Sequence, residues 1–167
     1  PYGPGDDPDR PDVGPIRIEV IEPLKRVHLV FDGDKAAPFS FDLTYDYRVE
    51  PVLTERNRIE IEGVVVTDYV NFFASGRYTG TIDVDGRTVA VDAFGFRDRG
   101  WGLRKHEGAP RRGFVMGMFT EFDDECIYAL LYETGSTRRV FSNGWVLRPE
   151  HPAQIVESIE HDLVIRD

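Results

Sequence analysis

Apolar and polar residues alternate without a break from Phe39 to Val49. An extended strand places successive side chains on opposite faces, whereas a helix distributes such positions around its surface. The segment therefore predicts a β-strand with one apolar and one polar face. Before it, the shorter alternation from Ile16 to Val20 and the apolar stretch from Leu24 to Phe31 predict two further strands. The apolar positions of the long segment are Phe39, Phe41, Leu43, Tyr45, Tyr47 and Val49.

The dipeptide Asp85-Gly86 separates two segments whose apolar residues change parity. From Tyr78 to Val84 the larger apolar residues occupy even positions, and from Val89 to Ala93 they occupy odd positions. A two-residue turn, for which Asp-Gly is a favoured dipeptide, requires this change if one face is to stay apolar. We therefore expect a hairpin that pairs Val84 with Arg87, Ile82 with Val89, Gly80 with Val91 and Tyr78 with Ala93.

Two more dipeptides indicate turns. Asn143-Gly144 predicts a tight hairpin between residues 138–142 and 145–148, and Asp123-Asp124 predicts a turn between Phe114–Phe122 and Glu125–Glu133. The stretch Ala153–Leu163 fits both helical and strand spacing, so both alternatives stay open. Together the patterns predict an all-β fold, an antiparallel barrel or sandwich of about eight to ten strands with little helix.

The length of 167 residues is that of one domain with one core. Residues 1–15 contain mostly Pro, Gly and Asp and no apolar group of residues, so we expect an extended or disordered tail. Residues 16–167 are then expected to form a single β domain. No apolar run approaches the roughly 20 residues of a membrane span.

The formal net charge is −10, which argues against nucleic acid and acidic lipid surfaces as partners. The chain has a single cysteine, Cys126, which cannot form an internal disulfide. A chain without a disulfide framework favours a reducing, cytoplasmic location. We expect no metal and no cofactor, because the four histidines are scattered without ligand spacing and no phosphate-binding glycine loop is present. These histidines are His28, His106, His151 and His161.

The ten residues from Gly95 to Arg104 differ from the rest of the chain. They contain three glycines, three arginines, one aspartate and one tryptophan. Gly100 and Gly102 flank Trp101 and allow backbone angles that other residues resist. With Lys105, Arg111 and Arg112, this region is basic in an otherwise acidic chain.

This segment resembles the Gly-x-Arg-Asp-His/Arg-Ser-Trp-Gly-x-Arg signature of the carotenoid 1,2-hydratase and tocopherol-cyclase-like group. The lead-in from Tyr78 to Arg87 is similar to that group, and so is residue stretch 22–26. The resemblance implies a lipocalin-like (calycin) β domain and a relation to cyclases of polyketide or isoprenoid chains. Gly100 stands where the group has Ser, so any role of that hydroxyl is lost. Members often carry two such domains, which implies a homodimer or a second β domain as a partner.

For the signature residues, the resemblance implies roles that compete with structural ones. Asp98 is the candidate catalytic residue, a general acid that protonates an alkene; the alternative is a carboxylate paired with Arg97 or Arg104. Trp101 either lines a pocket or plugs the fold. The candidate substrate-binding residues are Trp101, Arg97, Arg104, Tyr45, Tyr47, Phe41 and Tyr78, and the aromatic row among them can equally be core.

Three function classes follow. The first is an enzyme that binds an apolar polyene, isoprenoid or polyketide-type substrate in a β-barrel pocket and promotes its hydration or cyclisation, as a hydratase (lyase) or cyclase. The second is a non-catalytic carrier of a hydrophobic small molecule. The third is a structural half-domain that packs on a partner and exposes an apolar face.

Overall fold

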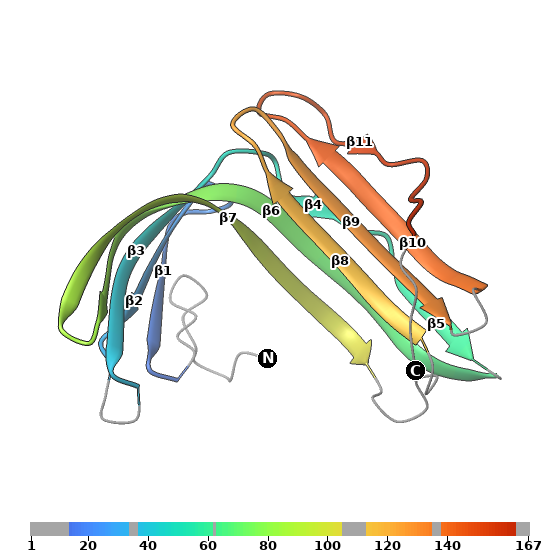
Figure 1. The fold of residues 1–167 in the computed structure, drawn as a ribbon, viewed down its shortest axis with the longest axis horizontal. Helices are drawn as coiled ribbons and strands as arrows, with labels where there is room; N and C mark the ends of the chain where they lie inside the picture. The colour runs from blue at the N-terminus through green and yellow to red at the C-terminus, as the bar shows by residue number, and fades with distance from the viewer. Residues whose placement is uncertain (1–13, 34–36, 62, 105–112, 135–137, 163–167) are drawn as a thin grey trace. The chain divides into compact units, whose positions relative to one another are not determined.

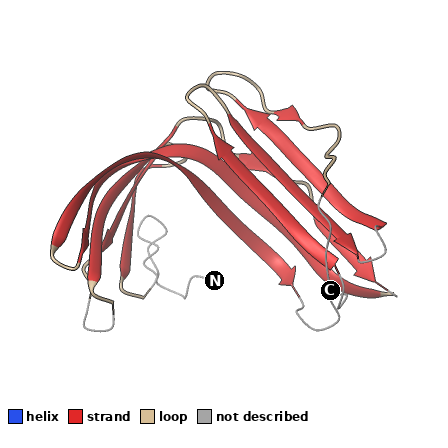
Figure 2. Ribbon diagram, in the orientation of Figure 1, coloured by secondary structure: helices blue, strands red, loops and turns tan. Residues whose placement is uncertain are grey.

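The computed structural model describes residues 14–33, 37–61, 63–104, 113–134 and 138–162. These residues form strands and loops without a helix (Figures 1 and 2), which confirms the all-β prediction. They make two antiparallel sheets, one of seven strands and one of four, and the described strands of neither sheet close on themselves. The strands are β1 Ile16–Glu22, β2 Arg26–Phe31, β3 Phe39–Tyr47, β4 Val52–Leu53, β5 Asn57–Ile61, β6 Val64–Val84, β7 Arg87–Arg104, β8 Gly113–Glu121, β9 Cys126–Thr134, β10 Arg138–Leu147 and β11 Gln154–Ile155.

The chain divides into two compact units. Unit 1 comprises Pro1–Arg48 and Ser75–Gly95, and unit 2 comprises Val49–Ala74 and Phe96–Asp167. The long strands β6 and β7 each contribute one part to unit 1 and the other part to unit 2.

Unit 1 contains β1, β2, β3 and the adjoining parts of β6 and β7. The register of β1, β2, β3 and β6 explains why the alternation from Phe39 is so regular, because the rows that contain its apolar residues consist of apolar residues and glycine. One row consists of Ile16, Phe31, Phe41 and Ile82, and another of Val20, Val27, Tyr45 and Tyr78. Burial of this apolar face is deepest at Val27, Phe31 and Tyr45, which are at most 7% exposed.

The opposite face of unit 1 carries charges that pair across strands. Arg26 Nε lies 2.5 Å from Asp46 Oδ1. His28 Nε2 lies 2.8 Å from Asp42 Oδ1, and Arg77 pairs with Asp92. The strands therefore have one apolar and one solvated face, as the alternation predicts.

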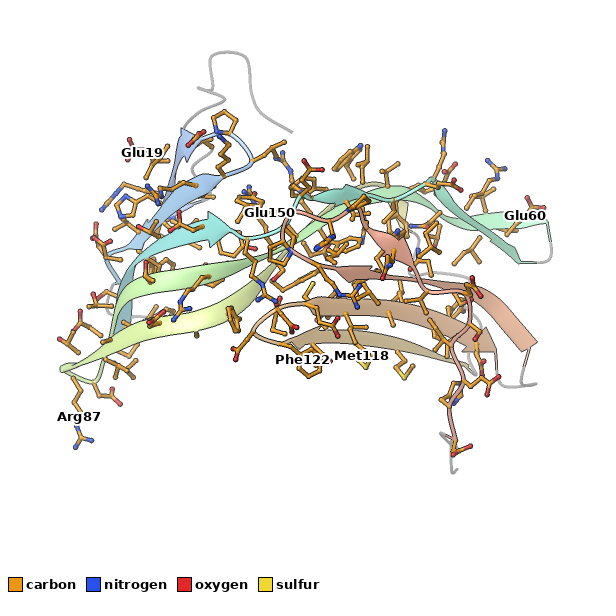
Figure 3. All side chains as sticks on the ribbon, turned by 90° about the horizontal axis from the view of Figure 1, so that it is seen from above. Glu19, Glu60, Arg87, Met118, Phe122 and Glu150 are labelled. Carbon is orange, nitrogen blue, oxygen red and sulfur yellow. The ribbon has the colours of Figure 1, made fainter. Side chains whose placement is uncertain are left out.

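The hairpin at Asp85-Gly86 is confirmed. It joins β6 to β7, and both central residues have positive φ, 50° and 73°, as a type I′ turn requires. Arg87 extends at the tip of this hairpin (Figure 3). The individual residue pairs between β6 and β7 stay a prediction.

Unit 2 is a two-layer structure around an aromatic cluster. One layer is the sheet β11-β10-β9-β8, and the other contains β4, β5 and the unit 2 parts of β6 and β7. The ring centroid of Phe73 on β6 lies 4.2 Å from that of Tyr128 on β9, and Phe96 on β7 lies 4.1 Å from Phe119 on β8. Strands of both sheets thus pack face to face. We call Phe73, Phe96, Phe119, Tyr128 and Trp145 the aromatic cluster.

Strand β8 is an edge of the four-stranded sheet. Met118 on this strand and Phe122 just after it (both labelled in Figure 3) are 43% and 46% exposed. The predicted turn at Asp123-Asp124 is confirmed here, because Glu121 pairs with Cys126 and Phe122 N donates to Glu125 O at 2.8 Å.

The predicted hairpin at Asn143-Gly144 is wrong. Strand β10 runs through both residues, which pair with Leu130 and Ala129 on β9. Glycine is needed for close packing instead: a Cβ at Gly144 would lie 2.7 Å from Tyr128 O and 3.1 Å from Val156. Turn dipeptides and close-packed glycines look the same in a single sequence.

The pattern of residues 153–163 fits both a helix and a strand. Its described part contains the two-residue strand β11, where Ile155 pairs with Trp145, and Val156 N donates to Gly144 O at 2.9 Å. Residues 156–162 have no regular secondary structure, and Leu163 lies outside the described residues.

Candidate ligand-binding site

The signature segment is part of strand β7, and its residues 96–104 form the unit 2 part of that strand. Alternation along a strand places Asp98 on the same face as Phe96, which belongs to the aromatic cluster. The next positions on this face are Gly100 and Gly102, which have no side chains. The inner face of β7 thus changes within a few residues from an aromatic ring to a carboxylate and then to bare backbone.

Asp98 is held by an asparagine from the neighbouring strand. Asn71 Nδ2 donates a hydrogen bond to Asp98 Oδ1 at 3.3 Å, and Asn71 is 6% exposed. Asn71 N in turn donates to Thr54 Oγ1 at 2.9 Å, and Asn57 Nδ2 lies 3.4 Å from the same oxygen. Since Thr54, Asn57 and Asn71 are all buried, these contacts form a fixed polar support beneath an exposed carboxylate.

Sequence reasoning missed this support. Asn57 and Asn71 lie in β5 and β6, and asparagine is depleted in strands because its side chain competes for backbone hydrogen bonds. An asparagine inside a β-rich segment is therefore a signal that could have marked both residues.

A pocket of about 270 Å³ lies beside Asp98. It is lined by Asp98, Gly100, Trp101 and Gly102, so two predicted site residues come together here. Trp101 is 52% exposed and lines this pocket; it does not plug a core. We call this the Asp98 pocket.

Gly102 sets the shape of the pocket floor. Its φ is +133°, and a Cβ there would lie 2.4 Å from Asp68 O and 2.6 Å from the Tyr69 Cα. Only glycine permits this close approach of β7 to β6.

The Asp68 carboxylate beneath this contact is fixed by two arginines. Arg56 Nη2 donates to Asp68 Oδ2 at 2.8 Å, and Arg58 Nη1 lies 3.4 Å from that oxygen. The hydrogen bonds from Arg56 and the charges of both arginines hold the pKa of Asp68 below its ordinary value, against the opposing effect of burial.

The two arginines predicted to bind substrate are Arg97 and Arg104, and Arg97 does not line the Asp98 pocket. Arg97 is half-buried and alternation places it on the face of β7 opposite Asp98. Arg104 ends β7, and its side chain lies outside the described residues, as does the basic stretch 105–112. An ion pair between Asp98 and either arginine stays a prediction.

The predicted aromatic row lies in unit 1. The ring centroid of Tyr45 lies 5.0 Å from that of Tyr47 in an edge-to-face contact and 4.6 Å from that of Tyr78 in a tilted one, and the centroid of Phe41 lies 5.6 Å from that of Phe31. Tyr45 is 1% exposed and its hydroxyl donates to Gly95 O at 3.3 Å, so it is a core residue of that unit. The structure thus divides the predicted site residues between two units: the aromatic row lies in unit 1, and unit 2 contains Asp98, Arg97, Trp101 and Arg104.

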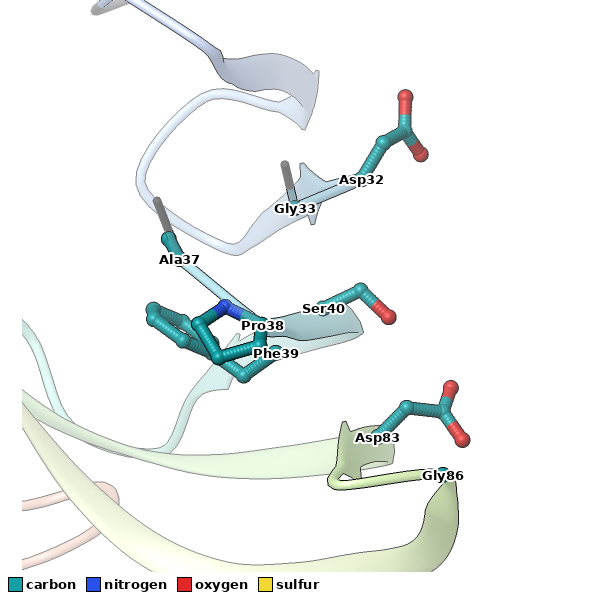
Figure 4. A pocket seen from close by; sticks show the side chains of 8 residues that line it. All are labelled: Asp32, Gly33, Ala37, Pro38, Phe39, Ser40, Asp83 and Gly86. Atoms are coloured by element: carbon teal, nitrogen blue, oxygen red, sulfur yellow. The ribbon is translucent and has the colours of Figure 1, made fainter. Parts of the chain in front are cut away.

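Unit 1 has a separate shallow pocket of about 280 Å³ at the beginning of β3. In Figure 4 the side chains of Asp32, Ser40 and Asp83 extend to one side of it, and Phe39 lies beside Pro38. The carboxylates already have partners, because Asp32 pairs with Arg17 and Asp83 accepts from Thr88. The Arg17 hydrogen bond lowers the pKa of Asp32. Unlike the Asp98 pocket, this pocket is lined by none of the predicted site residues.

The described residues contain no group of three or more His, Cys, Asp or Glu side chains placed to hold a metal ion. Nor does any helix long and apolar enough to cross a bilayer occur among them.

Comparison with known proteins bears on the fold and the family. The crystal structure of a Nitrosomonas europaea protein provisionally named AttH is similar to this chain, with a TM-score of 0.60 and 11% sequence identity over 84% of this chain. The match covers 43% of that chain, so this protein spans less than half the length of its structural neighbour. At this identity the likeness shows a shared fold alone. No curated protein sequence matches the chain. A family model does match, over residues 4–162, and the chain belongs to that family, DUF8625, a family of unknown function.

Proposed function

We propose that this protein binds an apolar polyene, isoprenoid or polyketide-type molecule at the Asp98 pocket and promotes its hydration or cyclisation. The observation that carries the proposal is the position of Asp98, next to Phe96 of the aromatic cluster on one face of β7 and open to a pocket. A proton donor beside aromatic rings is what alkene activation needs.

The chemistry assigns one step to Asp98. Its carboxyl group gives a proton to one carbon of a C=C bond, and the neighbouring carbon becomes a cation. Aromatic faces stabilise such a cation through their quadrupoles. Water then adds to the cation and loses a proton, which gives an alcohol, or a second C=C bond adds and later loses a proton, which gives a ring. An apolar ligand over the pocket would exclude water and so favour the neutral acid.

Asn71 is the positioning residue in this proposal. Its buried amide holds one carboxylate oxygen of Asp98 and leaves the carboxyl group exposed at the pocket. Much of the rate can come from holding the substrate chain in a reactive conformation, which needs few catalytic groups.

A carrier function is the second candidate. The hydrogen bond from Asn71 favours it, because this bond gives the Asp98 carboxylate a purely structural role, that of fixing β7 to β6. In that case the same pocket binds an apolar molecule without chemistry.

The proposal extends to a partner and a location. In this proposal a homodimer or a second β domain completes the pocket. We place the protein in the cytoplasm. Light scattering coupled to size-exclusion chromatography measures the mass in solution, and a strict monomer at working concentration contradicts the homodimer.

Turnover assays on the Asp98→Asn variant test the enzyme proposal. Purified protein is incubated with a panel of isoprenoid alcohols, polyenes and linear polyketides, and products are separated and weighed by mass spectrometry. Hydration adds the mass of water, and cyclisation gives a new retention time at unchanged mass. We expect Asp98→Asn to abolish product formation while Nile red binding and the melting temperature stay at wild-type values.

The matched control is Asp124→Asn, which changes an exposed aspartate at the β8–β9 turn of the same unit. It should leave turnover unchanged. Nile red binding without product from any substrate would support the carrier. Absence of both binding and product would overturn the pocket as a ligand site.

A further inference from the structure

The inner face of the four-stranded sheet changes from apolar to polar beyond the aromatic cluster. On β10, Leu147, Trp145 and Asn143 follow one another at every second position. They pair with Cys126, Tyr128 and Leu130 on β9, and all five apolar members of these pairs pack in the core of unit 2. Alternation therefore directs the Asn143 side chain to the interior of unit 2.

The side-chain amide oxygen of Asn143, Oδ1, is buried. No hydrogen-bond donor reaches it from the part of the chain that the structure describes. A buried acceptor without a donor costs free energy that most proteins avoid. Such groups persist where a ligand or a bound water supplies the missing donor.

The same row of the sheet contains a glycine. Gly117 on β8 pairs with Leu130, which pairs with Asn143, so the row contains one position without a side chain. A Cβ at Gly117 would make only ordinary contacts, at 3.4 Å to Phe119 and 3.9 Å to Leu130.

The facing layer has a similar order. Asn71 is two residues from Phe73 on β6, as Asn143 is two residues from Trp145 on β10, and the rings of Phe73 and Trp145 lie 5.1 Å apart. Both layers of unit 2 thus carry an amide one step along the strand from the aromatic cluster.

We infer that the ligand of unit 2 carries a hydroxyl group that donates a hydrogen bond to Asn143 Oδ1. The inference rests on the proposed function of the Asp98 pocket and narrows its substrate class to neutral alcohols or phenols with an apolar body. A carbonyl oxygen accepts from an O–H and gives nothing to an ether or a hydrocarbon. It also disfavours a carboxylate or phosphate end, which would bring only acceptors.

Farnesol and farnesyl methyl ether form a probe pair that differs in this donor. Their dissociation constants are measured by displacement of Nile red from wild-type protein, Asn143→Leu and Ser142→Ala. Ser142 is exposed and is the neighbour of Asn143 on the other face of β10, so its variant is the control. Melting temperatures of all three proteins report folding. Asn143→Leu should melt at or above the wild-type temperature, because it removes an unsatisfied buried group.

We expect wild-type protein and Ser142→Ala to bind farnesol about three- to tenfold more tightly than the ether, the value of one net hydrogen bond. Asn143→Leu should bind both equally. Equal binding of the two probes by folded wild-type protein would overturn the hydroxyl inference and would leave the proposed pocket intact. Asn143 Oδ1 would then accept from a bound water or from no donor at all. Failure of both probes to displace Nile red would overturn the proposed pocket and the inference together.

Discussion

The side-chain amide of Asn71 donates a hydrogen bond to Asp98 Oδ1 at 3.3 Å, although 27 residues separate the two in the chain. It links β6 to β7 at the edge of the aromatic cluster and sets the orientation of the candidate acid. Asn71→Ala should lower the free energy of unfolding by about 1–3 kcal/mol, because a buried network loses a member. It should also lower kcat more than it raises KM. Urea denaturation and turnover assays measure the two effects, and wild-type values in both would show that the contact is incidental.

Gly102→Ala tests the close approach of β7 to β6. The new Cβ would lie 2.4 Å from Asp68 O at a φ of +133°, so we expect a loss of stability on the order of 2–5 kcal/mol from backbone strain and overlap. Gly86→Ala is the control, since φ there is +73° but a Cβ would meet no atom within 4 Å. It should cost only about 1–2 kcal/mol. Equal melting temperatures for the two variants would contradict the close approach.

Acid should destabilise the protein through Asp68, Asp32 and Asp92. Arginine partners lower the pKa of all three from the ordinary value of 3.8. A carboxyl group with a lowered folded-state pKa stabilises the fold above its unfolded-state pKa, and this stabilisation is lost as the pH falls through the folded-state pKa. The urea midpoint should therefore fall below about pH 4. Asp68→Asn should flatten this fall and Asp124→Asn should not; an unchanged profile for Asp68→Asn would refute the assignment.

Tyr45→Phe separates a core role from a ligand-binding role. Tyr45 is 1% exposed and its hydroxyl donates a hydrogen bond to Gly95 O. Loss of this hydroxyl should reduce the free energy of unfolding by about 0.5–1.5 kcal/mol. Nile red affinity should not change, because the ring lies in the core of unit 1. A changed Nile red affinity with unchanged stability would show that Tyr45 is a ligand-binding residue.

Local rules predicted much of the fold. The alternation from Phe39 to Val49 predicted β3, because period-2 patterning has a single structural solution when one face is apolar. Asp85-Gly86 predicted its turn because two independent signals, dipeptide and parity, agreed. Asn143-Gly144 had only the dipeptide, and the register of β9 and β10 makes it a strand interior.

The candidate site was predicted less completely. Asp98 and Trp101 were recognised from their segment, and they do line one pocket. Asn71 and Asn143 were not recognised, because their roles depend on which strands face each other, and a sequence pattern specifies faces but not partners. Tyr45 shows the same limit for a residue that was predicted to bind substrate but lies in a core, since an aromatic row has the same sequence pattern in both cases.

The passage of β6 and β7 through both units has a consequence for how such proteins can diversify. Each unit is built from two separated stretches of chain, with boundaries after Arg48, Ala74 and Gly95. A single crossover between homologous genes cannot exchange one complete unit by itself, because every cut leaves parts of at least one unit on both sides. The two units therefore have to be inherited together, and new specificities are expected to arise by point substitution within a unit more readily than by shuffling of units.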